Sequence, residues 1–170
     1  MTSSGAGGVL HGKVAIVTGG ASGIGRATAL LLARERAWIV IADVNHMAGT
    51  DVLCEIASFG GHAVFEKADV SRGEDCARVV NRTRIEFGAL HILFNNAGIT
   101  RRADVVELDE ADWDRVMSVN VRSVFLMSKF AIPLIAASGG GSIINTASGW
   151  GSLGDRARPF IVRRKAPWCC

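Results

Sequence analysis

Residues 13–25 read Lys-Val-Ala-Ile-Val-Thr-Gly-Gly-Ala-Ser-Gly-Ile-Gly, an apolar run followed directly by a glycine-rich segment. The apolar run predicts a strand over Lys13–Thr18, and we expect a helix over Gly23–Arg36. Glycines permit a tight turn, and the unpaired N–H groups at a helix start favour negative charge. This order of strand, glycine loop and helix predicts a pyrophosphate-binding loop. An ordinary glycine-rich turn is the alternative.

Outward from this segment, short apolar runs alternate with longer amphipathic stretches. Such alternation predicts an α/β fold: a Rossmann-type doubly wound parallel sheet with helices on both faces. Further strands are expected at residues 38–42, 62–67, 90–95 and 142–146, and further helices at 46–59, 71–87 and 109–137.

Local signals set several of these boundaries. Ser71 with Glu74 three residues later forms a capping-box pattern, which predicts that a helix starts there. Glycine accepts the left-handed conformation that ends helices, so Gly60 and Gly88 are expected to end the two helices that precede them.

Composition limits the classes of protein to which the chain can belong. Apolar residues make up 49% of the 170 residues, charged residues make up 21%, and 20 residues are glycine. These values exclude a disordered acidic chain, a collagen and a disulfide-rich miniprotein. Tyrosine is absent, so no reaction in this chain can use a phenol.

The net charge of +3 arises from the C-terminal end of the sequence. Residues 155–170 contain five of the 19 basic residues and one of the 16 acidic residues, which leaves 14 basic and 15 acidic residues before them. A nucleic-acid surface requires Lys and Arg gathered on one face. We therefore expect no nucleic-acid partner.

The Cys and His positions suggest neither a metal site nor a disulfide framework. The four Cys show no Cys-x-x-Cys spacing and the four His are scattered singly, so we expect reduced thiols. Residues 1–8 lack a signal-peptide pattern, and no apolar run approaches the ~18 residues of a membrane-spanning helix. The expectation is a cytoplasmic protein without a membrane partner.

Asp43 closes the second predicted strand, eighteen positions after Gly25. An acidic group at about this spacing accepts hydrogen bonds from the hydroxyls of an adenosine ribose. A carboxylate there also repels a 2′-phosphate, so the expected cofactor is NAD rather than NADP. A solvated loop aspartate is the alternative.

The spacing Gly19-x-x-x-Gly23-x-Gly25 resembles that of the short-chain dehydrogenase/reductase family. The resemblance extends over about residues 9–151, because four further segments match the family in the same order. It implies NAD-dependent hydride transfer between an alcohol and a carbonyl, on a small-molecule substrate whose identity the sequence does not predict. The four segments are Asp69-Val70, Asn95-Asn96-Ala97-Gly98, Ser118-Val119-Asn120-Val121 and Ser148 with the strand before it.

The resemblance also implies a role for each matched residue. Asn120 would hold a water of the proton relay through its backbone carbonyl, and Ser148 would hydrogen-bond the substrate oxygen. Each segment alone has a structural alternative, such as a helix-start acid for Asp69, a turn residue for Asn96 or a loop hydroxyl for Ser148. The implied cofactor contacts are Gly19, Ser22, Gly23, Ile24 and Gly25 with the pyrophosphate, Asp43 with the ribose, Asp69 and Val70 with the adenine, and Asn96, Ala97 and Gly98 with the middle of the cofactor.

The sequence departs from the family at two places. Arg36 stands where a glycine commonly ends the first helix, and a left-handed conformation there would cost ~1–2 kcal/mol. The family's catalytic Tyr-x-x-x-Lys pair is missing, since its Tyr would fall near Phe160 or Ile161. We interpret Lys165, at the apparent Lys position, as coincidence. The resemblance therefore implies an impaired dehydrogenase, or alternatively an NAD-binding fragment without chemistry.

We divide the chain into an incomplete dinucleotide-binding domain, residues 1–151, and an atypical basic tail, residues 152–170. A complete domain of this fold has roughly 200–250 residues, so we expect a sheet truncated after its fifth strand, with an unpaired edge. The family implies a homo-oligomer, an implication that such a truncation weakens. Read from the third base of each codon, Phe160–Cys169 can encode Tyr-Cys-Ala-Ser-Lys-Gly-Ala-Val-Val, which contains the Tyr-x-x-x-Lys pair. We hypothesise a change of reading frame near Gly151.

Overall fold

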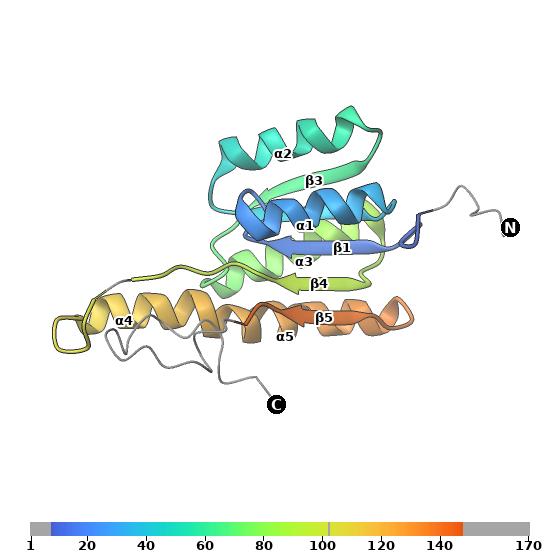
Figure 1. Cartoon of the computed structure of the whole chain (residues 1–170). Coiled ribbons are helices and arrows are strands. Elements are labelled where there is room, and N and C mark those ends of the chain that lie inside the picture. The colour runs from blue at the N-terminus through green and yellow to red at the C-terminus, as the bar shows by residue number, and fades with distance from the viewer. Residues whose placement is uncertain (1–7, 102, 148–170) are drawn as a thin grey trace, which may run out of the picture.

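The computed structural model describes residues 8–101 and 103–147. They form a five-stranded parallel sheet with the strand order β3-β2-β1-β4-β5 (Figure 1). The predicted α/β fold, with helices on both faces of a parallel sheet, is confirmed. The strands are β1 (Val14–Thr18), β2 (Trp38–Asp43), β3 (His62–Lys67), β4 (Ile92–Asn95) and β5 (Ser142–Asn145).

Helices connect the strands and cover the sheet. Most predicted boundaries agree with the structure to within two residues. Gly60 and Gly88 have φ angles of 76° and 73°, as predicted for glycines that end helices. The helices are α1 (Gly23–Arg34), α2 (His46–Ser58), α3 (Gly73–Phe87), α4 (Glu110–Met117), a π-helical segment η1 (Ser118–Arg122) and α5 (Ser123–Ala137).

Two apolar layers cover the sheet, one on each face. Successive strand residues point to opposite faces. On one face Ile16 and Leu93 pack with residues of α3 and α5, and on the other face Val17 and Ile41 pack with α1 and α2. All five residues of β1 are buried, as expected for the central strand of a doubly covered sheet.

The helix predicted over residues 109–137 is not a regular α-helix throughout. The segment η1 interrupts it and places Asn120 in a wider turn, where the side chain is 1% exposed. Such π-helical turns occur frequently at functional sites. The interruption could not be predicted from apolar spacing, because it involves a contact with a distant loop that is described below.

The predicted capping box at Ser71 is wrong. The N-cap of α3 is Arg72, and the Ser71 hydroxyl instead donates to Asp69 Oδ1 at 2.7 Å. The Asp69 carboxylate, two residues away, competes with the helix terminus for this hydroxyl. Asp75, in the first turn of α3, reaches back and accepts a hydrogen bond from the Asp69 N–H at 2.8 Å.

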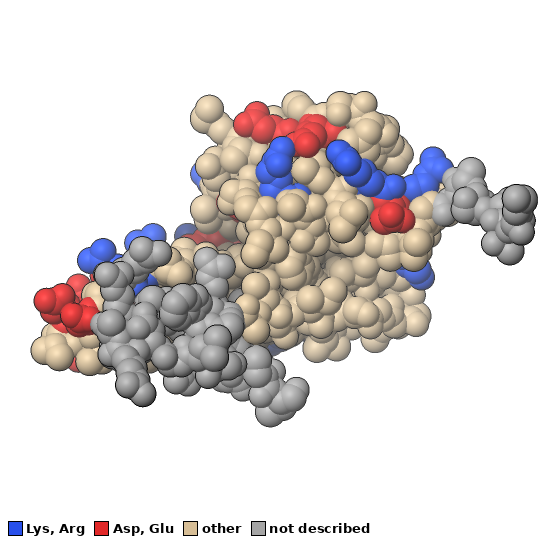
Figure 2. Space-filling model, in the orientation of Figure 1, with Lys and Arg blue, Asp and Glu red and all other residues tan. Residues whose placement is uncertain are grey.

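The strand β5 lies at one edge of the sheet. It pairs with β4, and all four of its residues are exposed. The helix α5 behind it also exposes Phe125 by 58% and Ile132 by 52%. In Figure 2 the surface over β5, in the lower part of the view, consists mainly of uncharged residues. Among the described residues, β5 is the edge strand on this side of the sheet, and the expected truncation after it stays a prediction.

One helical stretch, Glu110–Ala137, is long and apolar enough to cross a membrane by length and composition. The sequence expectation did not include it, because that expectation considered only uninterrupted apolar runs. In the structure, Leu126, Met127 and Ala131 of this stretch belong to the core between the sheet and α3. The stretch therefore occupies the position of a core helix.

Arg36 has a φ angle of 68°. The sequence analysis predicted a cost at this position if the backbone is left-handed, and the backbone is left-handed. A side chain with a Cβ is disfavoured in that conformation by ~1–2 kcal/mol. Arg36 lies in the turn between α1 and β2, away from the glycine loop.

Candidate cofactor-binding site

A cleft of about 430 Å³ lies at the carboxyl ends of the strands. The chain leaves β1 toward β2 on one side and enters β4 on the other, so this is the point where the strand order reverses. Ligands of open α/β sheets bind at such a position. The residues lining the cleft include ten that the sequence predicted: Gly19, Ser22, Gly23, Ile24, Asp43, Asp69, Val70, Asn96, Ala97 and Gly98.

Two glycines of the loop, Gly19 and Gly25, are packed too closely to accommodate a side chain. Gly19 has a φ angle of 63°, and a Cβ there would lie 2.9 Å from the Ala97 Cα. A Cβ on Gly25 would lie 2.0 Å from the Gly19 carbonyl oxygen. Gly25, which does not line the cleft, therefore contributes by allowing α1 to approach the loop.

Ser22 is the N-cap residue of α1, and its side chain makes no capping hydrogen bond. The residue is exposed and lines the cleft. Its hydroxyl and the N–H groups of the first turn of α1 can donate to a phosphate, and the helix dipole favours negative charge at this point. The arrangement fits the predicted pyrophosphate site.

Thr18 and Asn96 join the glycine loop to the end of β4. The Thr18 hydroxyl is buried and accepts hydrogen bonds from the N–H groups of Asn96 at 3.0 Å and Ala97 at 3.1 Å. The Asn96 side-chain amide donates to the carbonyls of Thr18 at 3.1 Å and Gly19 at 3.3 Å. Asn96 thus fixes the shape of the cleft. The sequence analysis missed Thr18, although its place as the last residue of β1 could have indicated it.

Asp43, at the end of β2, faces the same cleft. Its Oδ2 accepts from the Ala21 N–H at 3.0 Å and its Oδ1 accepts from the Asn45 N–H at 3.0 Å. A carboxylate oxygen has room for a second donor, so these contacts orient the group and leave it able to accept from ribose hydroxyls. The next residue, Val44, is exposed and carries no charge.

Asp69 and Val70 form the wall of the cleft after β3. The Asp69 Oδ1 accepts from the Ser71 N–H at 3.0 Å and from the Ser71 hydroxyl. Among the described residues, the Ser71 N–H and the Ser71 hydroxyl both donate to Oδ1 and not to Oδ2. Oδ2 can therefore accept a hydrogen bond from a ligand. Behind the wall, the buried Cys76 thiol lies 3.2 Å from the Val70 carbonyl oxygen. Burial raises the pKa of this thiol to about 12, so it remains protonated and acts as the donor.

Asn120 does not line the cleft but fixes one of its edges. The side chain accepts from the Ile99 N–H and donates to the Ile99 carbonyl, both at 2.8 Å. This pair of contacts joins η1 to the loop after Gly98. The predicted role of the Asn120 backbone carbonyl in a proton relay stays a prediction.

The sequence analysis missed the helical wall of the cleft. Arg115, Ser118 and Val119 line it, and Arg115 is exposed. Residues three and four positions apart lie on one face of a helix, so Arg115 shares a face with Ser118 and Val119. The position of Asn120 next to the cleft could have indicated that face.

Ser148, Phe160, Ile161 and Lys165 lie outside the described residues, as does the predicted tail, residues 152–170. Among residues 8–101 and 103–147, no group of three or more His, Cys, Asp or Glu side chains is arranged to bind a metal ion. Cys54 and Cys76 are both free thiols.

Comparison with known proteins agrees with the geometry of the cleft. The family model described as short chain dehydrogenase matches residues 13–159. The chain belongs to the short chain dehydrogenase family. Members of this family generally bind NAD or NADP, and the glycine loop, Asp43 and Asp69 of this chain line one cleft.

Curated relatives match most of this chain. Cyclohexanol dehydrogenase from Acinetobacter sp. (strain SE19) is 43% identical over 145 residues, which is 85% of this chain and 58% of the relative. An uncharacterized oxidoreductase from Thermotoga maritima is 40% identical over 156 residues, 92% of this chain and 61% of the relative.

A third relative, 2-dehydro-3-deoxy-D-gluconate 5-dehydrogenase from Escherichia coli (strain K12), is 41% identical over 140 residues, 82% of this chain and 54% of the relative. The chain thus spans between 54% and 61% of the length of these three relatives. All three names describe oxidoreductases, and two of them specify different substrates.

Proposed function

We propose that this chain binds NAD in the cleft. We further propose that the family reaction to which the chain belongs is NAD-dependent oxidation of an alcohol or reduction of a carbonyl. The observation that carries the proposal is the convergence of the glycine loop, Asp43 and Asp69 on one cleft at the switch point of the sheet. When bound, the nicotinamide cofactor supplies the hydride donor or acceptor.

Three groups that line the cleft have the chemistry to bind three parts of the cofactor. The Ser22 hydroxyl and the first N–H groups of α1 would bind the pyrophosphate. Asp43 would accept from the ribose hydroxyls, and Asp69 Oδ2 would accept from the 6-amino group of the adenine.

Asp43 supports NAD over NADP. A 2′-phosphate would be placed beside the Asp43 carboxylate, and the adjacent Val44 offers no positive charge to compensate. Arg115 is a basic residue that lines the cleft, but it comes from the helical wall and not from the end of β2. We therefore propose that NADH binds more tightly than NADPH.

The absence of Tyr supports impaired catalysis. A positioned general acid or base contributes typically 10²–10⁴-fold to the rate, and this sequence has no phenol to fill that role. The residues proposed to bind NAD, by contrast, all lie in the described part of the chain. We propose that the chain keeps cofactor binding and has lost most of its turnover, and the alternative is a binding module without any chemistry.

The test is a calorimetric titration of the full chain with NADH and with NADPH. We expect NADH to bind at least about tenfold more tightly, and Asp43→Asn to remove most of this preference, because the lost charge no longer repels the 2′-phosphate. Asp51→Asn, an exposed position on α2, is the matched control and should change neither affinity. Equal affinity for both cofactors, or no binding of either, would contradict the proposal.

Turnover separates the two versions of the proposal. Cyclohexanol with NAD is a reasonable first assay, because a relative named cyclohexanol dehydrogenase is 43% identical to this chain. A slow but measurable reaction would support the impaired enzyme, and binding without any reaction on an alcohol panel would support the binding module. Turnover at a rate ordinary for enzymes, about 10 s⁻¹, would contradict impairment.

A further inference from the structure

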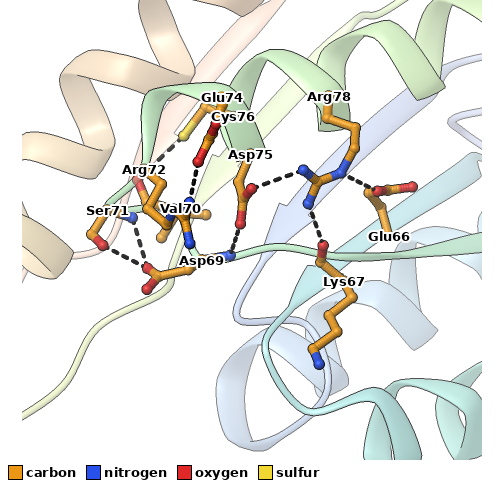
Figure 3. A network of polar contacts seen from close by, with 10 residues as sticks. All are labelled: Glu66, Lys67, Asp69, Val70, Ser71, Arg72, Glu74, Asp75, Cys76 and Arg78. Atoms are coloured by element: carbon orange, nitrogen blue, oxygen red, sulfur yellow. Dashed lines mark hydrogen bonds and ion pairs between the residues drawn. The ribbon is translucent and has the colours of Figure 1, made fainter.

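A chain of polar contacts runs from the end of β3 through α3 to the turn that carries Asp69 (Figure 3). Its centre is the Arg78 guanidinium. Arg78 Nε donates to Glu66 Oε1 at 2.7 Å, Nη1 donates to Asp75 Oδ1 at 2.8 Å, and Nη2 donates to the Lys67 carbonyl at 2.8 Å. The planar guanidinium thus binds three acceptors on two different elements, a geometry that an ammonium group cannot reproduce.

The Asp75 carboxylate continues this chain to the cleft. One of its oxygens accepts from Arg78, and the other accepts from the Asp69 N–H at 2.8 Å. Figure 3 shows Asp75 lying between the two residues. The Asp75 side chain is 14% exposed and that of Arg78 is 49% exposed, so only the Asp75 end of this ion pair is shielded from water.

Asp75 is ionised at neutral pH. Burial raises the pKa of this carboxyl, but the hydrogen bonds from the Asp69 N–H and from Arg78 lower it by more, so the pKa lies below the ordinary 3.8. A hydrogen bond to a charged acceptor is stronger than a neutral one. The bond to Asp69 therefore fixes the backbone more firmly than an ordinary turn contact.

The contacts fix both sides of a single residue, Ala68. The Lys67 carbonyl before it and the Asp69 N–H after it belong to this chain of contacts, and the Ala68 N–H donates to the Asp43 carbonyl at 3.0 Å. The backbone from β3 into the turn is thus held on each side. The direction in which Asp69 presents its carboxylate depends on these contacts.

We propose that Arg78 and Asp75 are positioning residues for recognition of the adenine base: together they fix the Asp69 backbone so that Oδ2 meets the 6-amino group. This inference rests on the proposed binding of NAD in the cleft. Neither residue lines the cleft itself, and both act through Asp69.

A purely stabilising role would be weak at this position. The Arg78 side chain is 49% exposed, and exposed ion pairs contribute little to folding stability. Orientation of a ligand contact, by contrast, is sensitive to shifts of the order of 1 Å. Loss of Arg78 should therefore affect discrimination between ligands more than it affects the free energy of unfolding.

The test compares NADH with its hypoxanthine analogue, which has a carbonyl oxygen in place of the 6-amino group. We expect the wild-type chain to bind NADH roughly tenfold more tightly than the analogue, since one hydrogen bond to a charged group is lost. In Arg78→Ala and in Asp75→Ala this preference should fall to about twofold or less, mainly through weaker NADH binding. The double variant should equal the single variants, because both act through one path.

Two further variants make the comparison specific. Arg82→Ala is the matched control: Arg82 lies on the same helix, is 45% exposed and pairs with Glu86 at 3.0 Å. It should keep the wild-type preference. Asp75→Asn keeps an oxygen that can accept from the Asp69 N–H, so it should restore part of the preference lost in Asp75→Ala.

Hydrogen exchange gives a readout without any ligand. The Asp69 amide should exchange faster in Arg78→Ala and Asp75→Ala than in wild type and Arg82→Ala, because its acceptor is lost or less well held. Unchanged exchange together with an unchanged preference would overturn the positioning role. An equal loss of affinity for both dinucleotides would also overturn it. If the wild-type chain binds neither dinucleotide, the proposed function itself fails.

Discussion

The two sides of the sheet differ in how far their strand residues are buried. On the side formed by β1, β2 and β3, all five residues of β1 are buried, and the four middle residues of the edge strand β3 are half-buried. On the β5 side, all four residues of the strand are exposed. The residues proposed to bind the adenosine lie on the first side, and the family's proton-transfer residues would follow the second.

The polar groups follow the same division. Asp43 and Asp69 each accept two hydrogen bonds from neighbouring groups, and Asp69 is further tied to α3 through its N–H. Toward β5, Asn95 donates to the Asn145 side chain at 3.0 Å and Thr146 lies 3.4 Å from Asn96. The two aspartates proposed to bind the adenosine are thus held by contacts with residues before β4, and none of these contacts comes from β5.

Truncation of one isoleucine on each side of the sheet tests this difference most strongly. Ile41→Ala, on β2 and 0% exposed, should lower the free energy of unfolding by about 2–5 kcal/mol. Ile144→Ala, on β5 and 49% exposed, should lower it by about 1 kcal/mol or less. Urea denaturation measures both. Similar losses at the two positions would show that β5 is covered in solution.

Among the described residues, Arg36 is the one non-glycine residue with a positive φ. It lies just before β2, on the side of the sheet formed by β1, β2 and β3. Arg36→Gly should raise the free energy of unfolding by about 1 kcal/mol, because glycine adopts this conformation without strain. Arg34→Gly, at the last residue of α1, should lower it, because glycine is unfavourable in a helix and the contact of Arg34 with the Phe59 ring is lost. Thermal melts of both variants check the opposite signs. A loss of stability in Arg36→Gly would show that the side chain contributes more than the backbone strain costs.

His91 lies where the two sides meet, and its effect should be the smallest. The imidazole Nδ1 accepts from the Val14 N–H at 3.0 Å, a bond that protonation at Nδ1 would break. Burial and the nearby Lys13 lower the pKa of His91 from the ordinary 6.5. The native state therefore disfavours the proton, so this contribution to stability is complete above pH 6.5 and is lost as the pH falls through the lower native pKa.

Melts between pH 7.5 and pH 5 should detect this loss, which we expect to be below about 1 kcal/mol. In His91→Gln the decrease in stability between pH 7.5 and pH 5 that comes from His91 should be absent. The exposed control His11→Gln should show the same decrease as wild type. An unchanged slope in His91→Gln would assign the pH dependence to another group.

The resemblance to the family supplied Asp69, Val70, Asn96, Ala97 and Gly98 among the residues that line the cleft, whereas local pattern was sufficient to predict the strands and the glycine loop. These features depend on period, on glycine and on the order of elements, which a sequence displays directly. The prediction at Arg36 succeeded for the same reason, since a missing glycine is visible in the sequence.

The features that were missed depend on contacts between distant residues. Asn120 widens its helix into η1 while bonding to Ile99, 21 positions away, and Thr18 bonds to Asn96, 78 positions away. The capping box at Ser71 failed because Asp69 competes for the hydroxyl. No local propensity includes these partners, so a sequence pattern alone could not supply them.

The most direct test of the central claim is a crystal structure of the full chain grown with NAD. We expect density for the dinucleotide in the cleft, with the pyrophosphate at the glycine loop, the ribose at Asp43 and the adenine at Asp69. A cleft closed by side chains, or a cofactor bound elsewhere, would contradict it.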